Sequence, residues 1–125
     1  MNRFRVTAFL YQSVGTDSAT GPCWVAQGLE FNVAAQGRDE REVKLRFMNT
    51  VSDQVMLDLH NQEEIPLHHL DPAPKEMFEA AINSEAFGPV LPVWLPKQII
   101  WWRKERIFVY VQFLRTRTAP SRRDM

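Results

Sequence analysis

A group of side chains that could bind a metal ion is crowded into the segment from residue 60 to residue 71. Three histidines and three carboxylates stand there: His60, Glu63, Glu64, His68, His69 and Asp71. Zinc sites use cysteine and histidine at short recurrent spacings, and this group matches none of them. The segment has the composition of a polar connection, in which such side chains are solvated. We therefore predict no metal ion and no cofactor.

The sequence lacks the residues that usually carry out nucleophilic catalysis or bind phosphate. Cys23, the single cysteine, stands in an expected strand without a basic neighbour, and buried structural thiols are inert. The sequence has no nucleophile-elbow serine and no glycine-rich phosphate loop. Two-metal nucleases need several carboxylates, whereas the expected core strands offer only Glu30, because Asp39 is expected to cap a helix. We therefore predict no catalytic residues and no enzymatic activity.

The best candidates for contact with another macromolecule lie near the C-terminus. Adjacent residues of a strand point to opposite faces, so one of the two neighbouring tryptophans is expected outside the core. Exposed tryptophan beside arginine is typical of interface hot spots. The predicted partner-binding residues are Trp101, Trp102, Arg103, Arg106, Phe108 and Tyr110. Coverage of both tryptophans by a proline-rich segment is the open alternative.

Basic residues in the same region raise a second possibility, which is binding of nucleic acid. The residues for that alternative are Arg103, Lys104, Arg106, Arg115 and Arg117. No aromatic side chains are interleaved with the arginines of the tail, so a solvated tail is favoured. Binding to a partner protein is therefore the first prediction, and binding to nucleic acid is the alternative.

Composition sets the class of protein. The chain has 125 residues, with 15 basic and 15 acidic side chains and 45% hydrophobic residues. These values are ordinary for one globular domain, and the net charge points to neither nucleic acid nor a membrane. A lone cysteine fits a reducing compartment. No signal peptide and no membrane-spanning run is recognised, so we predict a cytoplasmic protein.

The first half of the chain predicts three strands and a long helix. Alternating apolar residues indicate strands at 3–12 and 23–30, and a short third strand follows at 31–36. Gly28 inside the second strand indicates a bulge or a close backbone approach. Asp39 and Glu42 have the spacing of a capping box, which begins a helix expected to run from residue 40 to about 61.

The second half predicts a short helix, an extended arm and a hairpin. The helix is expected from Pro74 to about residue 83. Three prolines make residues 87–96 an extended arm on apolar surface. A hairpin is expected from 98–102 and 107–114. The prediction is an α+β fold with a small antiparallel sheet packed on one long helix. It forms one domain over 1–114, with its core at 3–60 and an extension at 61–114, followed by a disordered tail at 115–125.

Part of this pattern resembles the HicB antitoxin family. The resemblance rests on Trp24-Val25-Ala26-Gln27-Gly28-Leu29, on Ala34-Ala35-Gln36-Gly37, and on the cap residues Asp39 and Glu42. It covers residues 3 to about 60. Pro72-Ala73-Pro74 and Met77-Phe78 are similar to a HicB-like bacterial subgroup. The family fold implied is a partial ribonuclease-H-like sheet and helix without the catalytic acids.

The resemblance implies a protein that binds and blocks another protein, in the family a small ribonuclease toxin. Two departures stand out, because Phe31-Asn32 replaces the family's Pro-Gly-Cys turn and Val43 replaces a small residue. The chain also lacks the family's appended DNA-binding domain, so operator binding is not implied. The combined prediction is a non-enzymatic inhibitor of a nuclease or defence effector, acting as a homodimer.

Overall fold

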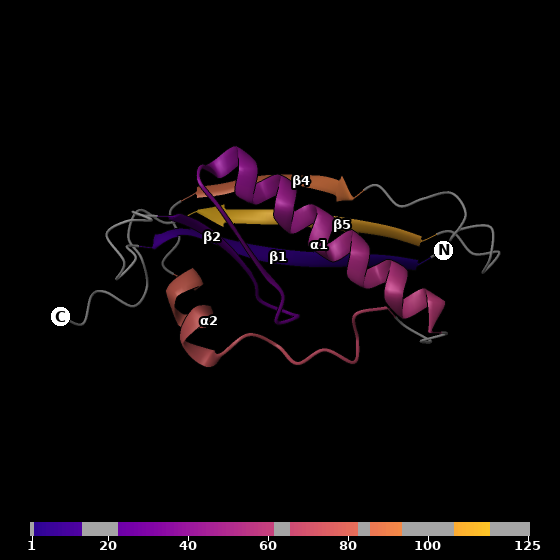
Figure 1. Cartoon of the computed structure of the whole chain (residues 1–125). Coiled ribbons are helices and arrows are strands. Elements are labelled where there is room, and N and C mark those ends of the chain that lie inside the picture. The colour runs from indigo at the N-terminus through magenta and orange to yellow at the C-terminus, as the bar shows by residue number, and fades with distance from the viewer. Residues whose placement is uncertain (1, 14–22, 62–65, 83–85, 94–106, 116–125) are drawn as a thin grey trace.

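A computed structural model describes residues 2–13, 23–61, 66–82, 86–93 and 107–115 of the chain. They form an α+β fold, a five-stranded mixed sheet with two helices (Figure 1). The elements in chain order are β1 (Asn2–Ser13), β2 (Cys23–Gly28), β3 (Ala34–Gly37), α1 (Glu40–His60), α2 (Lys75–Ile82), β4 (Ala86–Val93) and β5 (Ile107–Arg115). The strand order is β3-β2-β1-β5-β4, so β3 and β4 are the edges of the sheet.

The sheet is antiparallel in the part predicted from the first half of the chain, but not throughout. β1 pairs antiparallel with β2, and β2 with β3, as expected. β5 instead runs parallel to β1, with Val6 opposite Val111 and Ala8 opposite Phe113. The predicted antiparallel sheet of the first three strands is therefore confirmed, and β5 adds a parallel pair that the sequence did not predict. A strand with apolar side chains on both faces suits this central, parallel position.

β4 replaces part of the expected extended arm. It pairs antiparallel with β5 along one edge of the sheet, with a register irregularity between Phe87 and Val90. Proline is tolerated at an edge, where its missing N–H group need not bond to a neighbouring strand. The second strand of the predicted hairpin is β5, whereas residues 98–102 lie outside the described residues. Among the described strands, the antiparallel neighbour of β5 is β4.

α1 covers one face of the sheet, which we call the inner face (Figure 1). Val43, Phe47, Val51 and Val55 are fully buried in its apolar stripe, and they pack against inward residues of β1, β2 and β5. The predicted cap is confirmed, because the Asp39 carboxylate accepts a hydrogen bond from the N–H of Glu42 at 2.8 Å. Helix propensity, capping and burial therefore all agree along this element.

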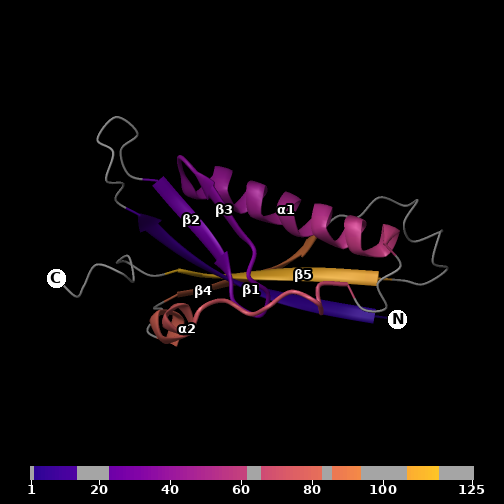
Figure 2. The same cartoon turned by 60° about the horizontal axis from the view of Figure 1, so that its bottom comes forward.

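The opposite face, here called the outer face, is covered at one end by α2 (Figure 2). A second apolar cluster forms there from Phe9, Leu29, Ala73, Ala81 and Leu114. The segment before α2 runs beside the β2–β3 connection, to which it is hydrogen-bonded through the N–H groups of Asn32 and Ala73. No described helix is long and apolar enough to cross a membrane.

Candidate functional site

The structure describes three of the residues predicted to bind a partner or nucleic acid. Phe108 and Tyr110 lie in β5, and Arg115 is its last residue. The others lie outside the described residues: Trp101, Trp102, Arg103, Lys104, Arg106 and Arg117. The candidate site therefore has to be built from the sheet itself and from α1.

The half of the outer face away from α2 carries the two described aromatic residues. Strand pairing places Phe108 opposite Arg3, and Tyr110 between Arg5 and Pro92. Both aromatic rings are half-buried, whereas the two arginines and the proline are exposed. Among the described residues, α2 covers only the other end of this face, around Phe9 and Leu114 (Figure 2). We call this half the aromatic surface; its residues are Arg3, Arg5, Pro92, Phe108, Tyr110 and Gln112.

Polar contacts order the arginine side of the aromatic surface. The Arg5 guanidinium donates a hydrogen bond to the amide oxygen of Gln112 on the neighbouring strand. The Glu30 carboxylate accepts from both the backbone N–H and the hydroxyl group of Thr7, at 2.6 and 2.7 Å. Glu30, the only carboxylate that sequence reasoning assigned to the core strands, therefore satisfies the backbone of β1. A surface pre-ordered in this way loses less side-chain entropy when it binds a partner.

Arg115 belongs to the fold and not to the tail. β5 continues one residue past the expected end of the strand at 114, since Arg115 still pairs with Leu10 of β1. Its guanidinium lies 3.0 Å from the Glu40 carboxylate and 5.7 Å from the centre of the Trp24 ring. A cation already engaged with a carboxylate and an aromatic face gives little support to the nucleic-acid alternative.

The edge formed by β3, which pairs with no second strand among the described residues, is the second candidate surface. The N–H of Gly28 donates to the carbonyl of Val33, which shows that odd-numbered residues of this segment bond to β2. Because backbone groups alternate in an antiparallel pair, the N–H and C=O groups of Ala34 and Gln36 point away from the sheet. Arg46 confirms this direction, since its Nη1 donates to the outward carbonyl of Gln36 at 3.1 Å. Two residues therefore present strand-pairing groups at this edge.

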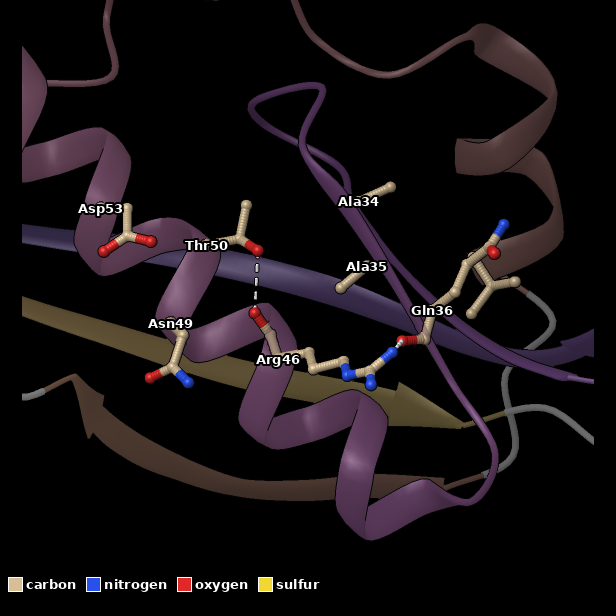
Figure 3. A pocket seen from close by; sticks show the side chains of 8 residues that line it. Ala34, Ala35, Gln36, Arg46, Asn49, Thr50 and Asp53 are labelled. Atoms are coloured by element: carbon tan, nitrogen blue, oxygen red, sulfur yellow. Dashed lines mark hydrogen bonds between the residues drawn. The ribbon is translucent and has the colours of Figure 1, made fainter.

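A hollow of about 570 Å³ lies between this edge and α1 (Figure 3). The strand side is formed by Val25, Ala34, Ala35 and Gln36, and the helix side by Arg46, Asn49, Thr50 and Asp53. Arg46 reaches toward Gln36, and Asp53 lies two turns further along the helix, on the side of Ala34 (Figure 3). Arg46, Asn49 and Asp53 lie on the side of α1 away from its buried apolar stripe, and the sequence alone does not show that a strand edge runs beside them.

The positive end of the hollow belongs to a small ionic cluster. Glu42 lies 3.4 Å from Arg38 and 3.8 Å from Arg46. A hydrogen bond from the backbone N–H of Arg38 lowers the pKa of Glu42, and the two guanidinium groups act in the same direction. The Glu42 carboxylate thus accepts from the backbone of Arg38 and not from that of Asp39, the cap residue. Among the residues that line the hollow, Arg46 supplies the positive charge at this end.

The described part of the segment considered for metal binding makes a structural contact with α1, and Glu63 and Glu64 lie outside the described residues. Asp58, which sequence reasoning overlooked, is 2% exposed in the last turn of α1. Its carboxylate accepts from the N–H of Leu67 at 2.8 Å and lies 2.7 Å from Nε2 of His69. His68 instead faces the ring of Phe31. Within the described ranges no three potential ligands gather around one point. An aspartate inside an apolar helical stripe was the sequence signal for this contact.

Cys23 lies at the start of β2 and is half-buried. Its pairing partner on β1 is Ser13, two residues from Tyr11. Burial raises the pKa of the Tyr11 hydroxyl, and the charge of Cys23 adds to this rise. A tyrosine held in its neutral form beside an apolar cluster contributes packing and is not an activated acid or base.

Comparison of the chain with protein-family models, with curated proteins and with solved structures found no match. The similarity to the HicB family therefore remains a prediction from the sequence. The site has to be interpreted from its own geometry, which offers an aromatic surface on the outer face and an open strand edge beside a charged helix.

Proposed function

We propose that this protein is a non-enzymatic module that binds a partner protein through the aromatic surface. The observation that supports this most directly is the position of Phe108 and Tyr110. Both rings lie half-buried on a sheet face that α2 covers only at its far end, and they are bordered by exposed arginines. Aromatic residues flanked by arginine are enriched where protein interfaces have their largest binding energies.

The shape of the surface suits a folded partner. A twisted sheet with side chains fixed by Arg5–Gln112 and Thr7–Glu30 contacts is nearly rigid, so a partner can dock without reordering it. In keeping with the resemblance to HicB antitoxins, the proposed consequence of binding is inhibition. The sheet would cover the active surface of a nuclease or another effector. The proposal includes Trp101 and Trp102, which precede β5 in the sequence, as further partner-binding residues.

The test is affinity purification of the full chain from its native cells, comparing two charge reversals. Arg5→Glu changes the aromatic surface, and Arg41→Glu is the matched control on an exposed position of α1. We expect the unaltered chain and R41E to retain a stoichiometric partner and R5E to lose it. A Tyr110→Ala variant should weaken the same complex, with circular dichroism confirming that it is folded. Failure to recover a partner, or equal recovery with R5E and R41E, would refute the proposal.

A further inference from the structure

The two edges of the sheet are protected unequally. β4 carries Pro89 and Pro92, and proline at an edge discourages pairing with another strand. β3 consists of Ala34-Ala35-Gln36-Gly37, which includes no proline and no charged residue. Natural proteins rarely leave a strand edge open without such devices, because unpaired N–H and C=O groups attract another strand. Apart from its short length of four residues and the contact of Arg46 with the Gln36 carbonyl, the β3 edge carries none of these devices, so it can receive a strand.

We propose that this strand is β3 of a second copy of the chain, paired antiparallel about a two-fold axis at Ala35. In that register Ala34 of each copy lies opposite Gln36 of the other. These are the residues whose backbone groups point outward, so both pairs can exchange N–H···O bonds. Ala35 lies on the axis with its own backbone groups already directed to β2. The edge is thus complementary to itself, as a closed two-fold interface requires.

The same two-fold axis pairs the charged residues beside the edge with residues of opposite charge. Arg46 lies at the Gln36 end of the hollow, and Asp53 lies toward the Ala34 end (Figure 3). The two-fold rotation exchanges these ends, so Arg46 of each copy faces the partner's Asp53. Seven helical residues separate the two side chains, or about 10.5 Å along the axis of α1. The midpoint between Arg46 and Asp53 on α1 falls near Asn49 and Thr50. Their neutral side chains can approach the same side chains of the second copy without repulsion.

One exposed apolar residue shares this helix face. Leu57 follows Arg46 by eleven residues, about three turns, so it lies on the same side of α1. It is 53% exposed, so covering it would remove apolar surface from water. In an antiparallel arrangement of the two α1 helices, Leu57 lies over the partner's Glu42 region and is partly covered by the aliphatic stems there.

Arg46 has a different contact in the separate chain and in the pair. In the single chain its guanidinium satisfies the outward carbonyl of Gln36 at 3.1 Å. In the pair that carbonyl accepts the partner's Ala34 N–H, and the guanidinium turns to the partner's Asp53. The arginine thereby satisfies an edge carbonyl before association, and it supplies an ion pair afterwards.

The pairing has a consequence for the aromatic surface. A two-fold axis perpendicular to the sheet makes one continuous sheet and leaves both α1 helices on the same face. The two outer faces then lie together on the other side. A dimer presents two aromatic surfaces to its partners, although the pairing itself does not depend on the proposed function of that surface.

The test is sedimentation velocity of the full chain over a range of concentrations. We compare wild type with Arg46→Asp, Asp53→Arg and the double variant R46D/D53R, and with Arg41→Asp as the matched control. Each single change replaces both symmetry-related attractions by repulsions, so we expect the dissociation constant to rise roughly tenfold. The double variant restores opposite charges and should dimerise like wild type, as should R41D. Ala34→Pro removes an outward N–H group and should also prevent pairing.

Three results would overturn the inference. The first is a wild-type chain that stays monomeric at every concentration. The second is a dimer that the single charge reversals do not weaken, or that the double variant does not restore. The third is a monomer whose partner protein in the affinity purification is lost with R46D, which would assign the edge to another protein. Loss of partner binding with R5E alone, in a normal dimer, would concern only the aromatic surface.

Discussion

Replacing Asp58 is expected to damage the protein more than any other single change to a polar residue of the described chain. The carboxylate is 2% exposed and is held by three donors: the N–H of Leu67 at 2.8 Å, Nε2 of Gln54 at 2.9 Å, and Nε2 of His69 at 2.7 Å. The bonds to Leu67 and His69 join the last turn of α1 to the turn at residues 66–69, where Leu67 adopts a positive φ of 72°. For a non-glycine residue that backbone conformation requires support from its surroundings.

The expected loss of folding stability follows from the polar groups that the substitution leaves without a partner. In Asp58→Ala the N–H of Leu67, a residue only 1% exposed, loses its partner, which costs about 1–3 kcal/mol. Loss of the charge-assisted bonds and the new cavity bring the total to roughly 3–5 kcal/mol. Asp58→Asn retains an oxygen acceptor for Leu67, so its cost should be smaller, about 1–2 kcal/mol. Asp71→Ala is the matched control, because Asp71 is exposed and contributes its backbone carbonyl to the fold.

Urea denaturation measures these differences, and amide hydrogen exchange locates them. The turn at 66–69 leads into the segment that bonds to the β2–β3 connection. Exchange at the N–H groups of Asn32 and Ala73 should therefore accelerate in D58A and stay unchanged in D71A. A loss of less than about 1 kcal/mol in D58A, or a loss equal to that of D71A, would refute the reasoning that this carboxylate joins the two segments.

Two further predictions concern local structure. Gly28→Ala should destabilise the fold by about 1–3 kcal/mol in the same denaturation assay, because the added Cβ would lie 2.6 Å from the carbonyl oxygen of Phe31; stability equal to wild type would show that the strand can shift. Glu42→Gln should reduce stability near neutral pH. The pKa of Glu42 is lowered in the folded state, so its contribution is present above the ordinary value of 4.5 and is lost as the pH falls through the lowered value. The difference between E42Q and wild type should therefore shrink in acid, and a difference independent of pH would contradict this.

Local patterns in the sequence determined several elements of this protein. The alternation in residues 4–11 predicts the two faces of β1, and the spacing of Asp39 and Glu42 predicts the start of α1. Gly28 was correctly interpreted as a close backbone approach. Such signals are visible in a sequence because strand alternation, capping and glycine geometry depend on residues a few positions apart. The α+β class follows from the order of these elements.

Only the tertiary structure decided which strands are neighbours. β5 lies parallel to β1, and β4 forms an edge strand from the segment expected to be an extended arm. Pairing between distant segments depends on their faces and on the whole chain path. The same arrangement makes β3 an edge and brings Arg46 and Asp53 beside it. It also buries Asp58 against a turn formed later in the chain. Residue types alone do not distinguish a solvated charge from one beside an open strand, since that difference arises only when the sheet and the helix pack together.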